Sequence, residues 1–386
     1  MTNSNLLFKS QVFSKREIDT VLRNNVLIDL FFGHANLLES LSANNNDLKR
    51  ELDYIKTHIP LRKINIDGLK QSSLLMFLLM LSGNCNANCE ICYTDRKCGP
   101  DSLSQKEIAE IVQKAYEMGV KTLYIPGEGE PLLDPNFIFL LEISKKLGLE
   151  IIIFSNGILF SNELLCQKQF KCSTIELINK LKKYHLSIYF KLWSFDPSKV
   201  SEMMGIDAHK CFNYVDFKIG NKKTAIPKGL FSLLNIYPRE RIGIETVLEK
   251  RNTDEIGDYF MPFIKQENLK FYMEPIIHSG RYSGLHKYDV NERYVIKYEN
   301  YLQRLQCQRI GYSIAIFNDA TISFCIGHSR SQDFKDSNQL RDKNGLKDIF
   351  HLIHTSPFII KARYYKGPCL CEILNNNPNV SPFVVK

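Results

Sequence analysis

The 386-residue chain lacks several features that would assign it to a particular class of protein. Its apolar run at residues 74–81 is too short to cross a lipid bilayer. No basic start is followed by a secretory apolar segment, so we expect a cytoplasmic protein with no membrane partner. Lys and Arg form no block of the kind that binds nucleic acid, so the net charge of +8 does not predict a nucleic-acid partner. We also find no internal repeat.

Cysteine, by contrast, is abundant, with 11 residues in the chain. In a reducing compartment such cysteines are more often metal ligands than disulfides. Cys85, Cys89 and Cys92 follow a C-x3-C-x2-C spacing, which places three thiols in one loop. Three Cys thiolates can hold an iron–sulfur cluster and leave one iron open for chemistry. On the triplet alone two alternatives stay open, a zinc site with Cys98 as fourth ligand and unliganded core cysteines.

From about residue 73 the pattern alternates between apolar strands and amphipathic helices. We expect six strands, at residues 74–81, 121–125, 150–154, 186–192, 242–248 and 270–277. Helices should begin at Ser104, where Glu107 completes a capping box, and at Asp134, which precedes a proline. The stretch 198–240 exceeds one crossover, and we expect a helix and an irregular insertion there. This alternation predicts a parallel α/β barrel with its active site at the carboxyl ends of the strands.

Short polar motifs stand at the ends of three of the expected strands. Residues 126–133 read Pro-Gly-Glu-Gly-Glu-Pro-Leu-Leu and follow the second strand. Glycine lets the backbone approach a ligand closely, although such a turn is also ordinary before a helix. Ser155-Asn156-Gly157 follows the third strand, and Ser194 follows the fourth.

Together with the cysteine triplet, these motifs resemble the radical S-adenosylmethionine (radical SAM) superfamily. The resemblance implies a partial (β/α)6 TIM-type barrel in which Cys85, Cys89 and Cys92 hold a catalytic [4Fe–4S] cluster. S-adenosylmethionine (SAM) would chelate the fourth iron. An electron from the cluster would then split SAM into methionine and a 5′-deoxyadenosyl radical, which abstracts hydrogen from a substrate. The protein would thus be an oxidoreductase or maturase-type enzyme.

The resemblance also implies which residues bind SAM, namely Ile91, Gly129, Glu130, Pro131, Ser155, Asn156 and Ser194. The Ile91 backbone would contact adenine, Glu130 would accept the ammonium group of the methionine end, and Ser194 would bond the ribose. Two residues depart from the family pattern. Ile91 stands where an aromatic residue usually precedes the third Cys, and Glu128 replaces the first of two paired glycines.

Side chains at the ends of the later strands are candidates for the rest of the pocket, namely Glu245, Thr246, Glu274, His278 and Arg281. Structural ion pairing is an equal alternative for the charged ones. Lys191 could reach the SAM carboxylate, whereas we expect Trp193, the only tryptophan, to pack.

Four more cysteines follow the expected barrel, namely Cys307, Cys325, Cys369 and Cys371. Residues 314–325 read as a hairpin, and a helix should open at Leu346. This order resembles the SPASM/twitch extension, and its cysteine count implies one auxiliary [4Fe–4S] cluster. Ala320 replaces the usual hairpin glycine, and the final pair is C-x-C. A cluster with three ligands and an iron open to substrate, or a zinc site, stays open.

We therefore predict a helical N-terminal extension (1–70), a radical SAM core (71–300) and a SPASM/twitch-like auxiliary domain (301–386). The resemblance favours peptide or protein modification, ahead of radical chemistry on a sugar, nucleotide or natural product. It implies an electron donor such as flavodoxin or ferredoxin. A non-catalytic iron–sulfur binding protein is the alternative of another class, and it would need no SAM pocket.

The two expected clusters can be separated by counting iron. After anaerobic reconstitution, the Cys85→Ala/Cys89→Ala/Cys92→Ala variant should retain about four irons and four sulfides per chain, because the C-terminal cysteines would hold their own cluster. The measurement is iron and acid-labile sulfide, with circular dichroism as the check of folding. A folded variant with no iron would contradict the auxiliary cluster.

Overall fold

The computed structural model describes residues 76–81, 83–94, 102–117, 120, 122–278, 280–282, 284–291, 313–323, 339–349 and 352. The expected N-terminal helices, Cys98 and the four C-terminal cysteines lie outside these residues. The division of the chain into three domains therefore stays a prediction.

An eight-stranded, mostly parallel sheet organises the described residues, as the α/β alternation predicts. Its order is β10-β9-β1-β2-β3-β4-β7-β8. The strands are β1 (Met76–Leu79), β2 (Thr122–Ile125), β3 (Glu150–Ser155), β4 (Leu186–Lys191), β7 (Ile242–Leu248), β8 (Lys270–Pro275), β9 (Ser313–Ile316) and β10 (Ile322–Ser323). All neighbours pair in parallel except β10 with β9. Within the described residues β8 and β10 are the edges of the sheet, so it is open there.

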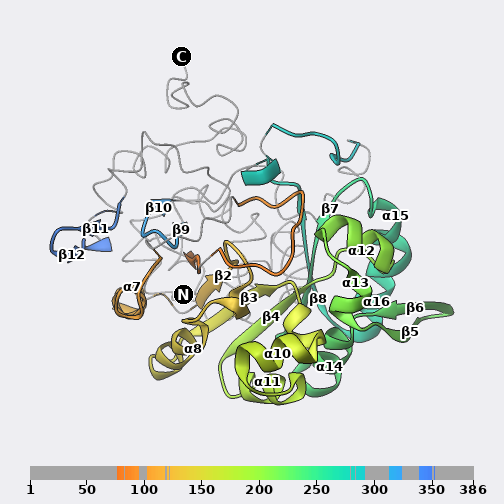
Figure 1. The fold of residues 1–386 in the computed structure, drawn as a ribbon, viewed down its shortest axis with the longest axis horizontal. Coiled ribbons are helices and arrows are strands. Elements are labelled where there is room, and N and C mark those ends of the chain that lie inside the picture. Colours follow the sequence, from red (N-terminus) through yellow and green to blue (C-terminus); the bar gives the residue numbers. More distant parts are fainter. Residues whose placement is uncertain are drawn as a thin grey trace, which may run out of the picture.

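The described residues also form helices and short helical turns, most of which connect the parallel strands. They are α7 (Gln105–Glu117), η2 (Pro131–Leu133), α8 (Phe137–Lys146), α9 (Ile158–Ser161), α10 (Glu163–Phe170), α11 (Thr174–Leu181), α12 (Pro197–Met204), α13 (Ala208–Phe212), α14 (Lys228–Ile236), η3 (Arg239–Arg241), α15 (Thr253–Glu255), η4 (Ile256–Phe260), α16 (Met261–Glu267) and η5 (Gly280–Tyr282). In Figure 1, α8, α10, α11 and α14 lie below the sheet, and the loop after β1 lies above it. None of the described helices is long and apolar enough to span a membrane.

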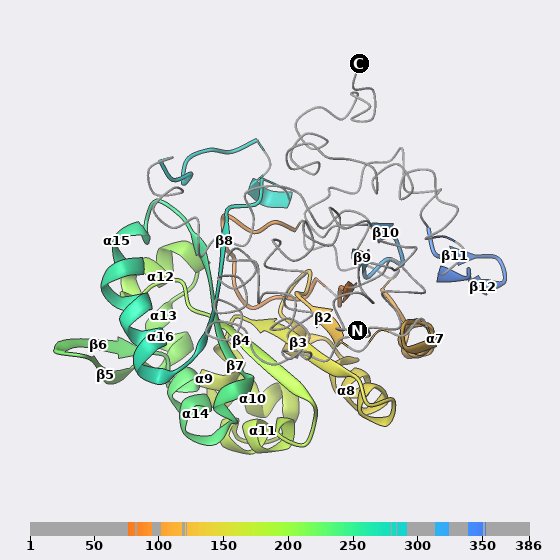
Figure 2. The same ribbon diagram turned by 180° about the vertical axis from the view of Figure 1, so that it is seen from behind.

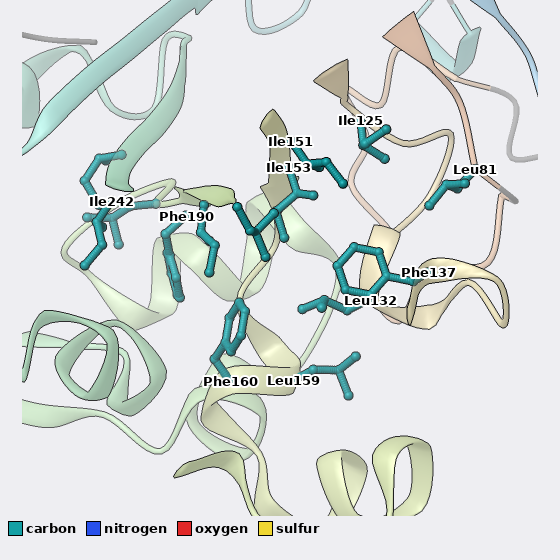
Figure 3. Packing of buried hydrophobic residues seen from close by; sticks show 14 of the residues in the cluster. Leu81, Ile125, Leu132, Phe137, Ile151, Ile153, Leu159, Phe160, Phe190 and Ile242 are labelled. Carbon is teal, nitrogen blue, oxygen red and sulfur yellow. The ribbon is translucent and has the colours of Figure 1, made fainter. Parts of the chain in front are cut away.

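The core forms because the parallel strands are apolar on both faces. Every residue of β3 is buried, and so is every residue of β2. Figure 3 shows Ile153 of β3 and Phe190 of β4 above Phe160 of α9, and all three are fully buried. This packing fixes the strands, and with them the loops at their carboxyl ends.

Two small hairpins stand at opposite ends of the molecule, as Figure 2 shows from behind. One pairs β5 (Val215–Ile219) with β6 (Lys222–Ile226), and the other pairs β11 (Arg341–Asp342) with β12 (Gly345–Leu346). The expectation of an irregular insertion in residues 198–240 was therefore wrong, since this stretch contains helices and a hairpin. The helix expected to open at Leu346 starts later than predicted, because Leu346 lies in β12 and the first helical residue is Ile349.

The predicted helix starts had different outcomes. The Ser104 capping box is confirmed, because the Ser104 amide donates to Glu107 Oε2 at 2.8 Å and the Glu107 amide donates to Ser104 Oγ at 3.3 Å. The expected N-cap at Asp134 was wrong by two residues, since Asn136 is the N-cap of α8, which begins at Phe137. Asp134 instead ends the preceding 3-10 turn, where its amide donates to the Pro131 carbonyl at 3.1 Å.

The expected hairpin near residue 314 is confirmed in β9 and β10, and it joins the main sheet. Ile314 and Ala315 of β9 pair in parallel with Phe77 and Leu78 of β1. Ala320 adopts a φ of +64°, a conformation that normally favours glycine. The hairpin therefore keeps its turn geometry although alanine replaces glycine.

Candidate functional site

The loop after β1 brings the three predicted cysteines to one pocket. Cys85, Cys89 and Cys92 are half-buried, and all three line this pocket. The pocket lies where the loops at the ends of the neighbouring parallel strands meet, as expected for an α/β sheet. Its volume is about 840 Å³, including the space open to solvent at its mouth.

Two glycines from other loops let the backbone pack against the cysteine loop. The Glu130 amide donates to the Asn84 carbonyl at 2.8 Å, and a Cβ on neighbouring Gly129 would collide with that carbonyl. On the other side the Arg281 amide donates to the Cys92 carbonyl at 3.0 Å. A Cβ on Gly280, which has a φ of +56°, would collide with the Tyr93 backbone. The cysteine loop is thus clamped between the loops after β2 and β8.

The residues after Cys92 bind the Gly-Glu-Gly-Glu-Pro loop directly. Tyr93 donates its hydroxyl proton to the Gly127 carbonyl at 2.9 Å, and Thr94 donates to the Glu128 carbonyl at 2.7 Å. Thr94 Oγ1 also lies 3.4 Å from Cys92 Sγ. Burial, reinforced by nearby negative groups, raises the pKa of Tyr93 well above its usual value, so its hydroxyl stays a donor.

Glu130 is a buried acceptor at the centre of the site. Its Oε1 accepts from Ser155 Oγ at 2.8 Å and from the Leu132 amide at 3.3 Å, and its Oε2 accepts from the Asn156 amide at 2.7 Å. Burial nevertheless raises the pKa of Glu130, although these bonds oppose the shift. A cation placed here would favour the ionised carboxylate.

Asn156 links Glu130 to the cysteine loop. Its Nδ2 donates to Asn86 Oδ1 at 2.7 Å and lies 3.8 Å from Cys85 Sγ. The Ser155-Asn156 motif therefore touches both the carboxylate and a predicted cluster ligand.

A second group of charges lines the opposite wall of the pocket. Lys191 Nζ lies 3.6 Å from Glu245 Oε2, and Tyr272 donates to Glu274 Oε1 at 2.7 Å. Burial and the neighbouring Glu274 raise the pKa of Glu245 to about 7, against the lowering effect of Lys191. Burial lowers the pKa of Lys191, but Glu245 and the nearby thiols outweigh it, so that pKa is raised and the amine stays charged. Lys191, Glu245 and Glu274 therefore give the pocket both positive and negative groups.

Most of the predicted SAM-binding residues come together in this pocket. Its lining includes Ile91, Gly129, Glu130 and Asn156, whereas Pro131 and Ser155 lie behind it. Pro131 begins the turn that follows Glu130, and Ser155 holds the Glu130 carboxylate.

Ser194 stands apart from the pocket lining. Its hydroxyl is fully buried and donates to the Glu255 carboxylate at 2.8 Å. Lys199 also pairs with Glu255 at 2.7 Å, and the Phe195 amide donates to it at 2.7 Å. In this structure the Ser194 hydroxyl therefore connects the end of β4 to α15.

Among the other candidates, Lys191, Glu245, Thr246 and Glu274 line the pocket, but His278 and Arg281 do not. The ring of Trp193 contributes to the lining although only 8% of the residue is exposed, so its packing role and its place at the pocket coexist.

Several lining residues were not singled out from the sequence, among them Thr94, Phe154, Val247 and Ile277. Phe154 stacks on Tyr189 with ring centroids 5.0 Å apart and forms an apolar wall. Phe154 could have been predicted as a pocket residue, because it stands one residue before the Ser155 motif at the end of the same strand. Glu128 lines the pocket as well, and its Oε2 accepts from the Asn318 amide of the β9–β10 turn at 3.2 Å. Glu128, which replaces a glycine of the family pattern, thus accepts a hydrogen bond from a distant part of the chain.

Comparison with known proteins agrees with this geometry. Residues 79–212 match the Radical SAM superfamily. The tungsten-containing aldehyde ferredoxin oxidoreductase cofactor-modifying protein of Pyrococcus furiosus is 31% identical over 91 residues. That match spans 22% of this chain and a quarter of the length of the relative (25%).

Solved structures show the same fold over most of the chain. Streptococcus suis SuiB bound to the precursor peptide SuiA aligns with a TM-score of 0.55 at 17% identity, covering 85% of this chain and 72% of SuiB. SuiB bound to S-adenosylmethionine gives 0.51 at 17% identity, covering 83% and 71%. Residues 79–212 are thus similar to the Radical SAM superfamily, and the two SuiB structures share the fold of this chain.

The close approach at Gly129 gives a direct test of the site. Gly129→Ala should lower reconstituted iron to the level of the triple cysteine variant, because its Cβ would displace the Asn84 carbonyl beside Cys85. Gly148→Ala is the matched control, since Gly148 has a φ of +69° but no atom within 4 Å of an added Cβ. A folded Gly129→Ala protein with wild-type iron would show that the clamp is unnecessary.

Proposed function

We propose that this protein is a radical SAM enzyme that cleaves SAM in the pocket formed by Cys85, Cys89 and Cys92. One observation carries the proposal. The three thiols share a pocket with the buried carboxylate of Glu130, which is held by donors from two strand-end loops. A protein that only stored an iron–sulfur cluster would have no need for such a polar cavity beside it.

The residues present fit a [4Fe–4S] cluster with one open iron. The pocket offers three half-buried thiols as soft ligands, and no fourth cysteine lies among its described lining residues. The loop is also fixed from both sides by the contacts at Gly129 and Gly280. A preorganised ligand set of this kind supports the assignment.

When bound, the cluster supplies the electron that splits SAM into methionine and a 5′-deoxyadenosyl radical. The residues of the chain would bind and orient SAM. Glu130 would accept the ammonium group of the methionine end, and the cation would compensate for burying this carboxylate. Lys191 would face the SAM carboxylate. Phe154 and Trp193 would exclude water from the reacting groups.

Peptide or protein modification is the substrate class that we propose. It is supported by the fold shared with SuiB, which has been solved with its precursor peptide, over 85% of this chain. Glu245 and Glu274 would then form an acidic wall able to receive a basic or amide-bearing side chain. Auxiliary-cluster chemistry at the C-terminal cysteines and reduction by flavodoxin or ferredoxin belong to the same proposal.

SAM cleavage tests the reaction. The reconstituted protein with dithionite and SAM should form 5′-deoxyadenosine under anaerobic conditions, as measured by chromatography with mass detection. Glu130→Gln should reduce the rate by at least about tenfold, because removing the charge loses a charge-assisted bond worth roughly 1.5–3 kcal/mol. Its KM for SAM should rise.

The matched control is Glu176→Gln, which changes an exposed carboxylate in the α11 capping box. It should retain the wild-type rate. If the wild-type protein holds iron at the three cysteines but forms no 5′-deoxyadenosine, the proposal is contradicted. The protein would then be a non-catalytic iron–sulfur binding protein.

The substrate class can be tested with an extract of the source cells. Peptide-containing fractions should stimulate 5′-deoxyadenosine formation, and protease treatment should abolish the stimulation. Stimulation that survives protease and passes an ultrafiltration membrane would instead identify a small-molecule substrate. Heat-treated extract without the enzyme controls for background cleavage.

A further inference from the structure

A separate cluster of possible metal ligands lies in the segment that follows β8. His278, His286 and Asp289 each offer one ligand atom, and these atoms all lie within 4.8 Å of one another. His278 Nε2 is 3.2 Å from Asp289 Oδ1, and His286 Nδ1 is 2.6 Å from Asp289 Oδ2. None of the three residues lines the SAM pocket. The cluster is therefore distinct from the cysteine site.

The spacing of these atoms suits a small transition-metal ion. Zinc binds His nitrogen and carboxylate oxygen at about 2.0–2.2 Å, so two ligands at a tetrahedral angle lie about 3.3 Å apart. The separation of His278 Nε2 and Asp289 Oδ1 matches that value. His286 is exposed, so a modest rotation of its ring can move Nδ1 from hydrogen-bond contact to a ligand position.

Asp289, a half-buried member of the cluster, carries a carboxylate oxygen that the described residues leave without a hydrogen bond of good geometry. Asp289 Oδ1 is shielded from solvent and makes no hydrogen bond of acceptable geometry with the described residues, although His278 Nε2 is nearby. Such atoms in folded proteins call for an explanation, and a bound ion is one of the common ones. A cation between the two groups would provide it.

The surroundings would hold these ligands in place. The ring of Tyr282 packs edge-on against His278 with centroids 5.6 Å apart, and the two imidazoles lie 4.7 Å apart. Groups that orient ligands in this way are typical of metal sites.

We propose that His278, His286 and Asp289 form a binding site for one divalent transition-metal ion of the zinc type, with water completing its coordination. Carboxylate and imidazole ligands favour such an ion over the thiophilic iron–sulfur chemistry expected at the cysteines. The inference is independent of the proposed function, since it would stand for a protein that never cleaves SAM.

The position of the site gives it a structural consequence. The segment between its ligands includes Arg281, whose amide donates to the Cys92 carbonyl at 3.0 Å and whose side chain binds Asn88. It also includes Tyr288, whose hydroxyl binds Glu90 and whose ring lies 3.6 Å from the Arg251 guanidinium. A metal ion bound by both His278 and Asp289 would cross-link the two ends of this segment. It would thereby stabilise the contacts that Arg281 and Tyr288 make with the cysteine loop.

The experiment uses the reconstituted full chain, in which iron occupies the cysteines, and it uses zinc as the probe. After treatment with a chelator, the protein is given one equivalent of zinc, and X-ray absorption at the zinc edge reports the ligands. We expect one zinc per chain with nitrogen and oxygen ligands only. Competition with a chromophoric chelator should show at least about tenfold weaker binding in His286→Gln and in Asp289→Asn.

His209→Gln is the matched control, because His209 is exposed on α13 and outside the cluster. It should bind zinc as the wild type does, and zinc should raise the melting temperature of both. Circular dichroism and iron content establish that each variant is folded. If His286→Gln or Asp289→Asn does not fold, His278→Gln replaces it as the ligand variant. Sulfur ligands to zinc, equal affinity in wild type and ligand variants, or no tightly bound zinc in the wild type would each overturn the proposal.

Discussion

The rest of the site depends on the hydrogen bonds that hold the buried carboxylate of Glu130. Taking a carboxylate out of water costs several kcal/mol unless donors replace the lost hydration. The donors here come from its own turn and from the loop after β3, while the Glu130 amide holds the cysteine loop through Asn84. One residue thus ties together the loops that follow β1, β2 and β3, and it lines the pocket.

Much of the fold followed from local signals in the sequence. The bounds of β7, Ile242–Leu248, agree with the expected apolar run, and the α7 start agrees because Ser104 and Glu107 satisfy each other within one turn. The α8 start was missed because Asp134 had two local uses, as a helix cap or as the end of the 3-10 turn. The local sequence is compatible with both uses of Asp134. In the folded protein Asp134 ends the 3-10 turn, and Phe137, the first residue of α8, is buried in the core.

The site was predictable where its chemistry is carried by a motif and not where it depends on distant partners. The cysteines, Gly129 and Asn156 meet at the pocket because each stands at the end of a parallel strand. The hydrogen bond from Ser194 to Glu255 joins it to a helix that follows another strand, and no local signal in the sequence predicts that contact. The contact of Glu128 with the Asn318 amide is likewise non-local, so the sequence shows only a missing glycine.

Strand β9 has a consequence for how the chain reaches this structure. It completes the sheet by pairing with β1, the strand that delivers the cysteine loop, yet it is made long after β1 during synthesis. Among the described strands only β9 pairs with that side of β1, and a strand without such a neighbour presents an edge open to other chains. Of the described strands, a chain that ends before β9 would therefore present the cysteine loop next to an unpaired strand edge.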